Sequence, residues 1–443
     1  MERIIGIQHR VKKTAKGEAH PTRVCILDNG QVQLFELATE SEELDFVLGR
    51  LPVSYRDAEA GDALDAVAEH HRQWRKVREG EASDGTALFI TSEHGGVRRL
   101  QIPDVREGLK PGDKVAMVLG GSGDAFAYAL SNRGAAIGAT VHRLPPRNLA
   151  LCRGDNSKEK DAELLARYLE SGGVGYHLVR SRDRDVIRLS ICFHERMLAL
   201  KDLMAAQQRQ HGRAIGQIFL SEEGQYPEGA LLDAVTTLRT SDDLLGALTV
   251  AHEEQLARLV DAAQSMPLYA AVFADIKGIG PRIAAGIIAA TVDIRRFPSV
   301  HAFKAFCGVH VLSGGKYGDV PTDQQFPRNK RGVAGNWQRD ARQALYLAAA
   351  DQFVKRPNTE WGQRLIANKE KCRAKHPVVM CKQCAAEFGS TCAKLKHTRR
   401  YTDGHIHRMA CWRTATQLAV YIYRAWRRFE RAQEAITDVS QAA

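Results

Sequence analysis

The stretch KVAMVLGGSGDAFAYALSNRGAAIGATVHRL, residues 114–144, decides the fold class of the first part of the chain. Its apolar start, KVAMVLGG, predicts a buried strand, and the segment DAFAYALSNRGA predicts a helix capped by Asp124. ATVHRL then predicts a second strand. A strand, a helix and another strand in succession indicate an α/β domain.

The residues before this stretch extend the same domain. Short β-rich runs lie at 3–7, 23–27 and 32–37, and Asp28-Asn29-Gly30 between the last two is a strong hairpin-turn signal. ATESEELDFVLGRL, residues 38–51, predicts a capped amphipathic helix. This order of elements predicts a mixed sheet in a domain that spans residues 1–177.

Residues 50–112 differ from the rest of this domain because they are charged and irregular. We interpret them as an insertion, with strand candidates at 87–91 and 97–102.

Residues 178–268 are rich in Leu, Ala, Arg, Glu and Gln at helical spacing. The pattern predicts long helices that connect two domains. These helices form either a coiled-coil arm that joins chains or an ordinary bundle. The first alternative favours a homodimer or homotetramer.

The C-terminal part, residues 269–443, contains the segment FADIKGIGPRIAAGIIAAT at 273–291. Gly278 and Gly280 allow a close approach of the backbone to a partner, and the helix that follows offers free N–H groups to a phosphate. With Arg282 beside the turn, the pattern is typical of a helix-hairpin-helix element that grips a DNA backbone. The alternative is a tight turn between two packed helices.

Residues 307–332, CGVHVLSGGKYGDVPTDQQFPRNKRG, form a glycine-rich segment with one serine, Ser313. A serine before a glycine is by itself more typical of a turn than of a nucleophile. Cations follow it in the same segment and in a helix, NWQRDARQALYLAAADQF, that would place Arg339 and Arg342 on a polar face. The cations that could hold phosphates near Ser313 are Lys316, Arg328, Lys330, Arg331 and Arg339.

The charge balance restricts the class of partner. The 63 Lys and Arg residues exceed the 52 Asp and Glu residues, which gives a formal charge of +11. This excess favours a polyanion, most simply nucleic acid, although a basic protein without such a partner would look the same. We find no signal peptide and no apolar run long enough to span a membrane, so we expect a cytoplasmic, nucleoid-associated protein without a membrane partner.

Five of the nine cysteines lie between residues 372 and 411. Cys381 and Cys384 form a Cys-x2-Cys knuckle that Cys392 follows, and Cys372 could complete a tetrahedral zinc site, as could His376, His397 or Cys411. Free cysteines in a basic arm are the alternative. The surrounding lysines and arginines predict that this insert, residues 370–397, faces nucleic acid.

Taken together, the GIG turn, the RFPS and CG segments, Ser313 with its glycine, the Lys-Arg-Gly and the ARQALY helix resemble the C-terminal domain of the insertion sequence one-ten family of transposases. This family includes pilin-gene invertases and bridge-RNA-guided recombinases. The N-terminal segments IIGIQHR, KVAMVLGG and NSKEKDAELLARYL fall where the family has a RuvC-like, ribonuclease H-like domain. The resemblance covers most of the chain except residues 50–112 and 370–397.

The resemblance implies a two-part active site. The RuvC-like half would hold Mg²⁺ with four acidic residues. Ser313 matches the serine that would form a covalent link to DNA, and a non-coding guide RNA is a further implied partner.

The sequence departs from the family at the acidic positions. Gln8, Val118 and Lys158 stand at three of them, and only Asp161 is acidic. The RuvC-like half is therefore inactive, or the alignment of these segments is shifted, or other acids rebuild the site. The acids available for rebuilding are Glu93, Asp124, Asp155 and Glu159.

These observations predict a DNA transposase or site-specific recombinase that uses Ser313 as its nucleophile. The main alternative is a catalytically silent protein of transposase origin that binds RNA or DNA. A nuclease or junction resolvase with a rebuilt acidic site is a third reading.

Overall fold

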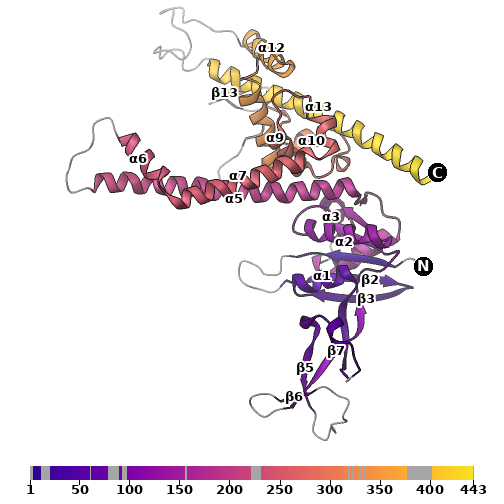
Figure 1. The fold of residues 1–443 in the computed structure, drawn as a ribbon. Coiled ribbons are helices and arrows are strands. Elements are labelled where there is room, and N and C mark those ends of the chain that lie inside the picture. The colour runs from indigo at the N-terminus through magenta and orange to yellow at the C-terminus, as the bar shows by residue number, and fades with distance from the viewer. Residues whose placement is uncertain are drawn as a thin grey trace, which may run out of the picture. The chain divides into compact units, whose positions relative to one another are not determined.

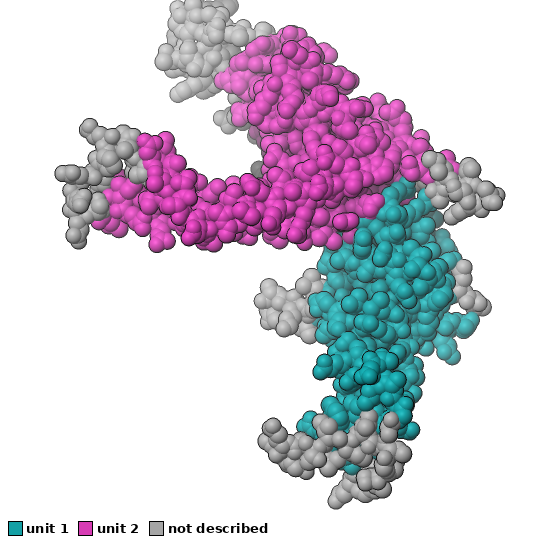
Figure 2. Space-filling view, in the orientation of Figure 1, with its two compact units in different colours: residues 1–184 teal, residues 185–443 magenta. Residues whose placement is uncertain are grey.

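The structure is a computed structural model of the 443-residue chain. It divides into two compact units, residues 1–184 and 185–443, and each is described by itself (Figure 2). The described residues are 3–10, 20–59, 61–77, 89–91, 97–154, 157–220, 231–314, 316–317, 320–321, 324–328, 332, 335–376 and 402–442.

The first unit is built on a six-stranded mixed sheet with the order β10-β9-β8-β1-β2-β3. β1 pairs antiparallel with β2 and β2 with β3, whereas β8 runs parallel to β1 and β9 parallel to β8. The predicted hairpin turn is confirmed, because Asn29 and Gly30 both have positive φ, 48° and 81°. The strand bounds are β1 Ile4–Gln8, β2 Thr22–Asp28, β3 Gln31–Leu37, β8 Lys114–Val118, β9 Thr140–Leu144 and β10 His177–Leu178.

The helices α1 to α4 accompany this sheet in the described part of the unit, and Figure 1 labels α1, α2 and α3. Gly6 lets α4 lie against β1, since a Cβ there would overlap the Ala162 carbonyl. The prediction that Asp124 caps α2 is wrong: Gly123 is the N-cap, and Asp124 is the first helical residue and forms an ion pair with Arg143. The helix bounds are α1 Glu40–Leu48, α2 Asp124–Ile137, α3 Pro146–Arg153 and α4 Asp161–Glu170.

The predicted insertion forms a second, four-stranded sheet with the order β4-β7-β5 and β6 paired to β7. Its small core contains Ala58, Val67, Leu100 and Ile102. The two strand candidates correspond to β6 and to the first part of β7. The bounds are β4 Leu51–Asp57, β5 Gln73–Lys76, β6 Phe89–Thr91 and β7 Val97–Glu107, with short 3-10 turns η1 Leu64–Ala66 and η2 Glu69–His71.

The second unit opens with the long helices predicted for the connector, α5 Ser181–Phe219, α6 Leu231–Thr240 and α7 Asp243–Gln264. α5 and α7 lie side by side (Figure 1). They run antiparallel, because Leu203 of α5 packs near Leu245 at the start of α7, while Leu189 shares a core with Leu259 near the end of α7. Apolar residues at helical spacing along both helices explain this pairing.

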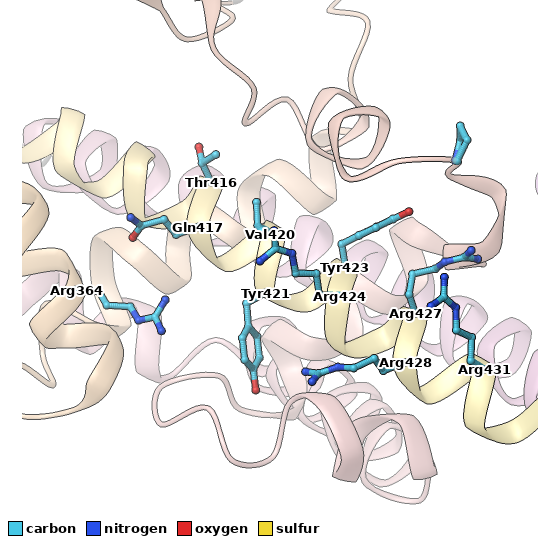
Figure 3. Close-up of a pocket in the computed structure, with 11 residues that line it drawn as sticks. Arg364, Thr416, Gln417, Val420, Tyr421, Tyr423, Arg424, Arg427, Arg428 and Arg431 are labelled. Atoms are coloured by element: carbon cyan, nitrogen blue, oxygen red, sulfur yellow. The ribbon is translucent and has the colours of Figure 1, made fainter.

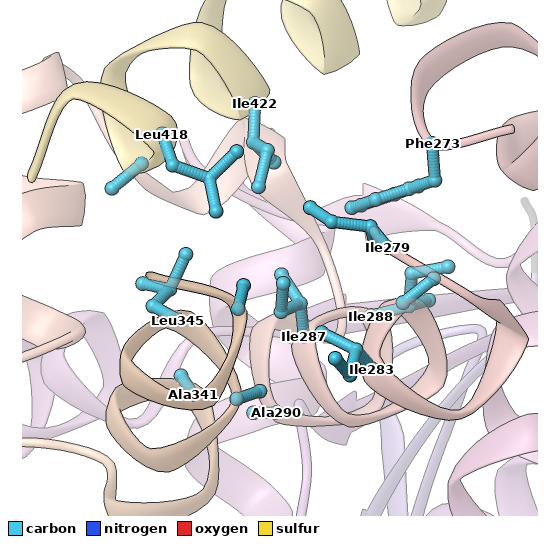
Figure 4. Close-up of a cluster of buried hydrophobic side chains, with 14 of the residues drawn as sticks. Phe273, Ile279, Ile283, Ile287, Ile288, Ala290, Ala341, Leu345, Leu418 and Ile422 are labelled. Carbon is cyan, nitrogen blue, oxygen red and sulfur yellow. The ribbon is translucent and has the colours of Figure 1, made fainter. Parts of the chain in front are cut away.

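The remaining helices surround one apolar core (Figure 4). α9 is at its centre, and every residue from Ile283 to Thr291 is buried. Leu345 of α11 and Leu418 of α13 pack into the same core. The helices are α8 Pro267–Val272, α9 Pro281–Thr291, η4 Ile294–Arg296, α10 Val300–Phe306, α11 Arg339–Leu347, the π-helical η5 Ala348–Gln352, α12 Glu360–Lys375 and α13 Asp403–Ala442.

Among its described residues, the segment after α10 contains four two-residue strands, β11 Leu312–Ser313, β12 Lys316–Tyr317, β13 Val320–Pro321 and β14 Gln324–Gln325. The protein is thus mixed α/β, with a sheet-containing N-terminal part and a helical C-terminal part, as the sequence predicts. Within the described ranges no helix has both the length and the apolar character needed to cross a membrane.

Candidate acidic site and nucleic-acid interface

Three of the four acidic-site positions lie in a hydrogen-bonded group at one end of the large sheet, and the fourth ends the neighbouring strand. Gln8 ends β1, and the parallel register of Ile7 with Met117 sets it beside Val118 at the end of β8. The Gln8 side-chain amide donates to the Lys158 carbonyl at 2.6 Å and lies 3.4 Å from Asp161 Oδ2.

Asp161 is held by an arginine that sequence reasoning missed. Nε and Nη2 of Arg153 each donate to one carboxylate oxygen of Asp161 at 2.7 Å. These hydrogen bonds raise the pKa of the Arg153 guanidinium. Because Asp161 is only 4% exposed, a buried two-pronged ion pair occupies this position.

These residues do not fit a Mg²⁺ ion. The group offers one carboxylate, which is already neutralised by a guanidinium that would repel a cation. An amide, a valine and a lysine stand where the other acidic ligands are expected.

The acids considered as replacements have other partners where the structure describes them. Asp124 pairs with Arg143 of β9, and Glu159 lies 3.8 Å from an Arg23 nitrogen with its side chain 67% exposed. Asp155 and Glu93 lie outside the described residues.

Ser313 is exposed on β11, where it pairs with Gln324 of β14. Arg328 is also exposed, and Lys316 begins β12. Lys330 and Arg331 lie outside the described residues, and Arg339 is exposed in the first turn of α11. The serine is therefore open to a large partner.

Arg342, predicted on a polar face, is half-buried between aromatic side chains. Its guanidinium lies 4.6 Å from the ring centres of both Trp337 and Trp412, and it donates to the Pro327 carbonyl at 2.6 Å. Burial lowers the pKa of Arg342. This half-buried arginine therefore links Pro327, in the segment that contains Ser313, to Trp412 of α13.

The two glycines of the GIG turn serve different purposes. Gly278 has a φ of 107°, and a Cβ there would lie 3.1 Å from the Phe353 ring, so this glycine allows internal packing. Gly280 is exposed, is the N-cap of α9, and has open space around its Cα. Arg282 is exposed in the first turn. Gly280 and Arg282 are thus the part of the turn that a partner can reach.

A basic groove of about 810 Å³ runs along α13 (Figure 3). We call it the arginine groove. Arg364 of α12 lines it but forms an ion pair with Glu360 at 2.6 Å. None of the four α13 arginines in the groove has an ion pair with another described residue. The five arginines that line it are Arg364, Arg424, Arg427, Arg428 and Arg431.

The aromatic residues of α13 are divided between the groove and the core, since Tyr421 and Tyr423 line the groove with these arginines. Trp426 is 1% exposed and donates to Glu430, and the Tyr423 hydroxyl donates to the Phe297 carbonyl. The helix therefore packs Trp426 in the core, while its arginines line the groove together with the two tyrosines.

One group of side chains in the first unit could hold a divalent metal. Nε2 of His70 and Nε2 of His71 lie 3.1 Å and 2.6 Å from the same Asp45 oxygen. Arg50 donates to the other oxygen of Asp45 at 2.7 Å. Two imidazoles and a carboxylate are a ligand set that suits zinc and similar ions.

The predicted zinc site lies mostly outside the described residues, because Cys381, Cys384 and Cys392 are not among them. Cys372 is fully buried in α12, and burial raises the pKa of its thiol. A raised pKa opposes the thiolate form that zinc requires.

No curated protein matches this chain. Residues 270–317 match the model of the Transposase IS116/IS110/IS902 family. The matched segment begins in α8, includes the GIG turn, α9 and α10, and ends just after Ser313 and Lys316. The resemblance to the insertion sequence one-ten transposases is confirmed over this segment, which is similar to transposases of the IS116/IS110/IS902 family.

Proposed function

We propose that this protein binds nucleic acid through its helical C-terminal part, and that its N-terminal part has lost the metal-dependent step of the family. DNA is the partner expected of a transposase. The strand order β3-β2-β1-β8-β9, with three antiparallel strands followed by two parallel ones, supports a ribonuclease H-like, RuvC-like origin for this part.

The observation that carries the proposal is the Arg153–Asp161 pair. The remaining carboxylate is already paired with an arginine of α3 in a buried, two-pronged contact. A protein that retained Mg²⁺ at this position would need to keep that carboxylate free for the ion.

Binding is supported by the charge distribution. The chain carries a formal charge of +11, and the four α13 arginines without an ion pair among the described residues line one groove. Arginine contacts phosphate in a two-pronged geometry, so this groove suits a nucleic-acid backbone.

The binding can be tested directly. Full-length protein should bind duplex DNA with the same dissociation constant in EDTA and in Mg²⁺ at equal ionic strength. Fluorescence anisotropy measures this. A dissociation constant that falls more than about tenfold on adding Mg²⁺ would show that a metal completes the complex and would overturn the proposal.

A second function is favoured by the position of Ser313, which is exposed and lies inside the family match. The Ser313 oxygen would form a bond to a DNA phosphorus while the bond from phosphorus to the leaving sugar oxygen breaks. The hydroxyl proton leaves to solvent, and the released sugar oxygen takes up a proton. Lys316, Arg328, Lys330, Arg331 and Arg339 would hold phosphates, in a homodimer or homotetramer guided by RNA.

This second function predicts a covalent protein–DNA adduct that disappears in Ser313→Ala while DNA binding stays within about twofold of wild type. Denaturing gel electrophoresis with end-labelled DNA detects such an adduct. Ser265→Ala is the matched control, because Ser265 is also exposed and its hydroxyl donates to the Ala262 carbonyl of its own helix. Equal adduct in wild type and Ser313→Ala would remove the nucleophile assignment.

A further inference from the structure

Three helices of the second unit meet at a group of cationic side chains. α9 crosses α5 where Phe193 contacts Gly286, since a Cβ at Gly286 would lie 3.3 Å from the Phe193 ring. Arg196 lies one turn beyond Phe193 on α5, and Arg282 lies one turn before Gly286 on α9. Both arginines therefore flank the same crossing point.

α7 adds a third member to this group. α5 and α7 are antiparallel, and two apolar contacts mark their pairing, Leu203 with Leu245 and Leu189 with Leu259. Arg196 lies on α5 between these two contacts. His252 lies between Leu245 and Leu259 on α7. The pairing therefore brings His252 to the same level as Arg196.

The buried polar atoms of this group are unsatisfied among the described residues. Arg196 is 8% exposed, its Nε has no hydrogen-bond partner, and its Nη1 lies 3.4 Å from the Met197 sulfur. His252 Nε2 and the side-chain oxygen of Gln255, one turn further along α7, are also buried without a partner. A buried guanidinium without a counterion is strongly unfavourable, so this arrangement calls for an anion.

The charges of this group also favour a bound anion. Burial lowers the pKa of Arg196, and the positive charge of Arg282 lowers it further. Burial, Arg196 and Arg282 all lower the pKa of His252, while Glu253 acts in the opposite direction. Glu253 is exposed, so the group keeps an excess of positive charge.

The N-terminus of α9 also favours a bound anion. Gly280 is its N-cap and no side chain caps the helix, while a Cβ at Gly280 would meet nothing within 4 Å. The positive end of an eleven-residue helix is thus left open beside Arg282.

We propose that Arg196, Arg282 and His252, together with the first turn of α9, bind a phosphate, and that this phosphate belongs to a nucleic-acid backbone. The second part rests on the proposed function. Arg196 supplies the buried charge, Arg282 the exposed one, and His252 a hydrogen-bond donor. Neither Arg196 nor His252 lies in the segment that matches the family model, so the site joins the GIG turn to the long helices.

The first experiment uses inorganic phosphate and needs no DNA. Phosphate should raise the melting temperature of the wild-type protein more than chloride of equal ionic strength, and Arg196→Met should lose this difference. In phosphate-free buffer, Arg196→Met should be at least as stable as wild type, because the variant removes an uncompensated buried charge. A less stable variant with an unchanged response to phosphate would show that Arg196 has only a packing role and would overturn the proposal.

The second experiment measures duplex DNA affinity. Arg196→Met and Arg282→Gln should each raise the dissociation constant about tenfold and lower the salt dependence by about one phosphate contact. Arg209→Gln, an exposed arginine further along α5, is the matched control and should change little.

The two experiments separate the outcomes. If phosphate stabilises the wild type through Arg196 while DNA affinity is unchanged in both variants, the site takes free phosphate, and the nucleic-acid assignment is wrong. If the wild type binds no DNA, the proposed function fails, and the phosphate experiment still decides whether the site exists.

Discussion

Arg153 and Asp161 form the pair on which the loss of metal chemistry depends. Both lie near the ends of neighbouring helices, α3 and α4, and both carboxylate oxygens are used. A charge pair of this kind is costly to break from one side, because the partner left behind stays buried.

Removing the arginine should therefore be more harmful than removing the acid. Arg153→Met leaves Asp161 buried without a counterion and should lower the free energy of unfolding by roughly 3 kcal/mol. Asp161→Asn should cost less, because the Arg153 side chain is 19% exposed. Chemical denaturation of both variants and of the double variant gives the coupling energy. If Arg153→Met has the same free energy of unfolding as the wild type, the Asp161 carboxylate does not depend on Arg153 and is free for a cation.

At the scale of elements, Asp57 joins three strands of the inserted sheet. It ends β4 and accepts hydrogen bonds from Arg75 of β5 and from Arg99 and Gln101 of β7. The hydrogen bond from Arg75 lowers the pKa of Asp57, burial opposes it, and Gln101 and Arg99 lower it further.

This pKa shift predicts the pH dependence of the inserted sheet. The pKa of Asp57 in the folded protein lies below its usual 3.8. The ionised carboxylate therefore contributes its full stabilisation of the fold above pH 3.8, and this contribution is lost as the pH falls through the lowered pKa. Asp57→Asn should lower the free energy of unfolding by about 1 kcal/mol at neutral pH and by less at a pH below the lowered pKa of Asp57. Asp104→Asn, on the exposed side of β7, is the control. An equal loss at both pH values would contradict the role given to the carboxylate.

Local signals in the sequence were sufficient for many elements. The Asn29-Gly30 turn, the Thr39 cap with Gly49 at the end of α1, and Pro281 at the start of α9 all have the conformations that their residue types favour. The inserted sheet was largely missed because its strands are charged and its pairing is distant, as with Leu51 opposite Glu107.

The contacts that define the candidate sites could not be predicted in the same way. Arg342 has the spacing of a polar face, yet it contacts the rings of both Trp337 and Trp412, and Trp412 lies in another helix. Arg196 looks like any arginine of a long helix until the antiparallel pairing of α5 and α7 buries it. Such contacts arise from tertiary packing, which periodicity does not encode.

At the scale of the whole molecule, the positive charge must act through particular surfaces. The arginine groove offers four arginines without acidic partners among the described residues and one, Arg364, that already has Glu360. This difference makes Arg364 an internal control.

Changing Arg424 and Arg428 to Gln together should weaken duplex DNA binding by about tenfold near physiological salt and reduce the slope of log K against log salt by about two. Arg364→Gln should have a much smaller effect, since its charge is already compensated. Equal effects of the two changes would show that the groove acts only through net charge.

The most direct test of the account is the fate of bound DNA under single-turnover conditions, with enzyme in excess and with either Mg²⁺ or EDTA. Wild-type protein should bind the DNA in both buffers, and Mg²⁺ should add no cleavage or strand transfer, because Arg153 already pairs with the Asp161 carboxylate. Mg²⁺-dependent breakage of the bound strands, lost in Asp161→Asn, would contradict this prediction and would return the acidic site to the mechanism.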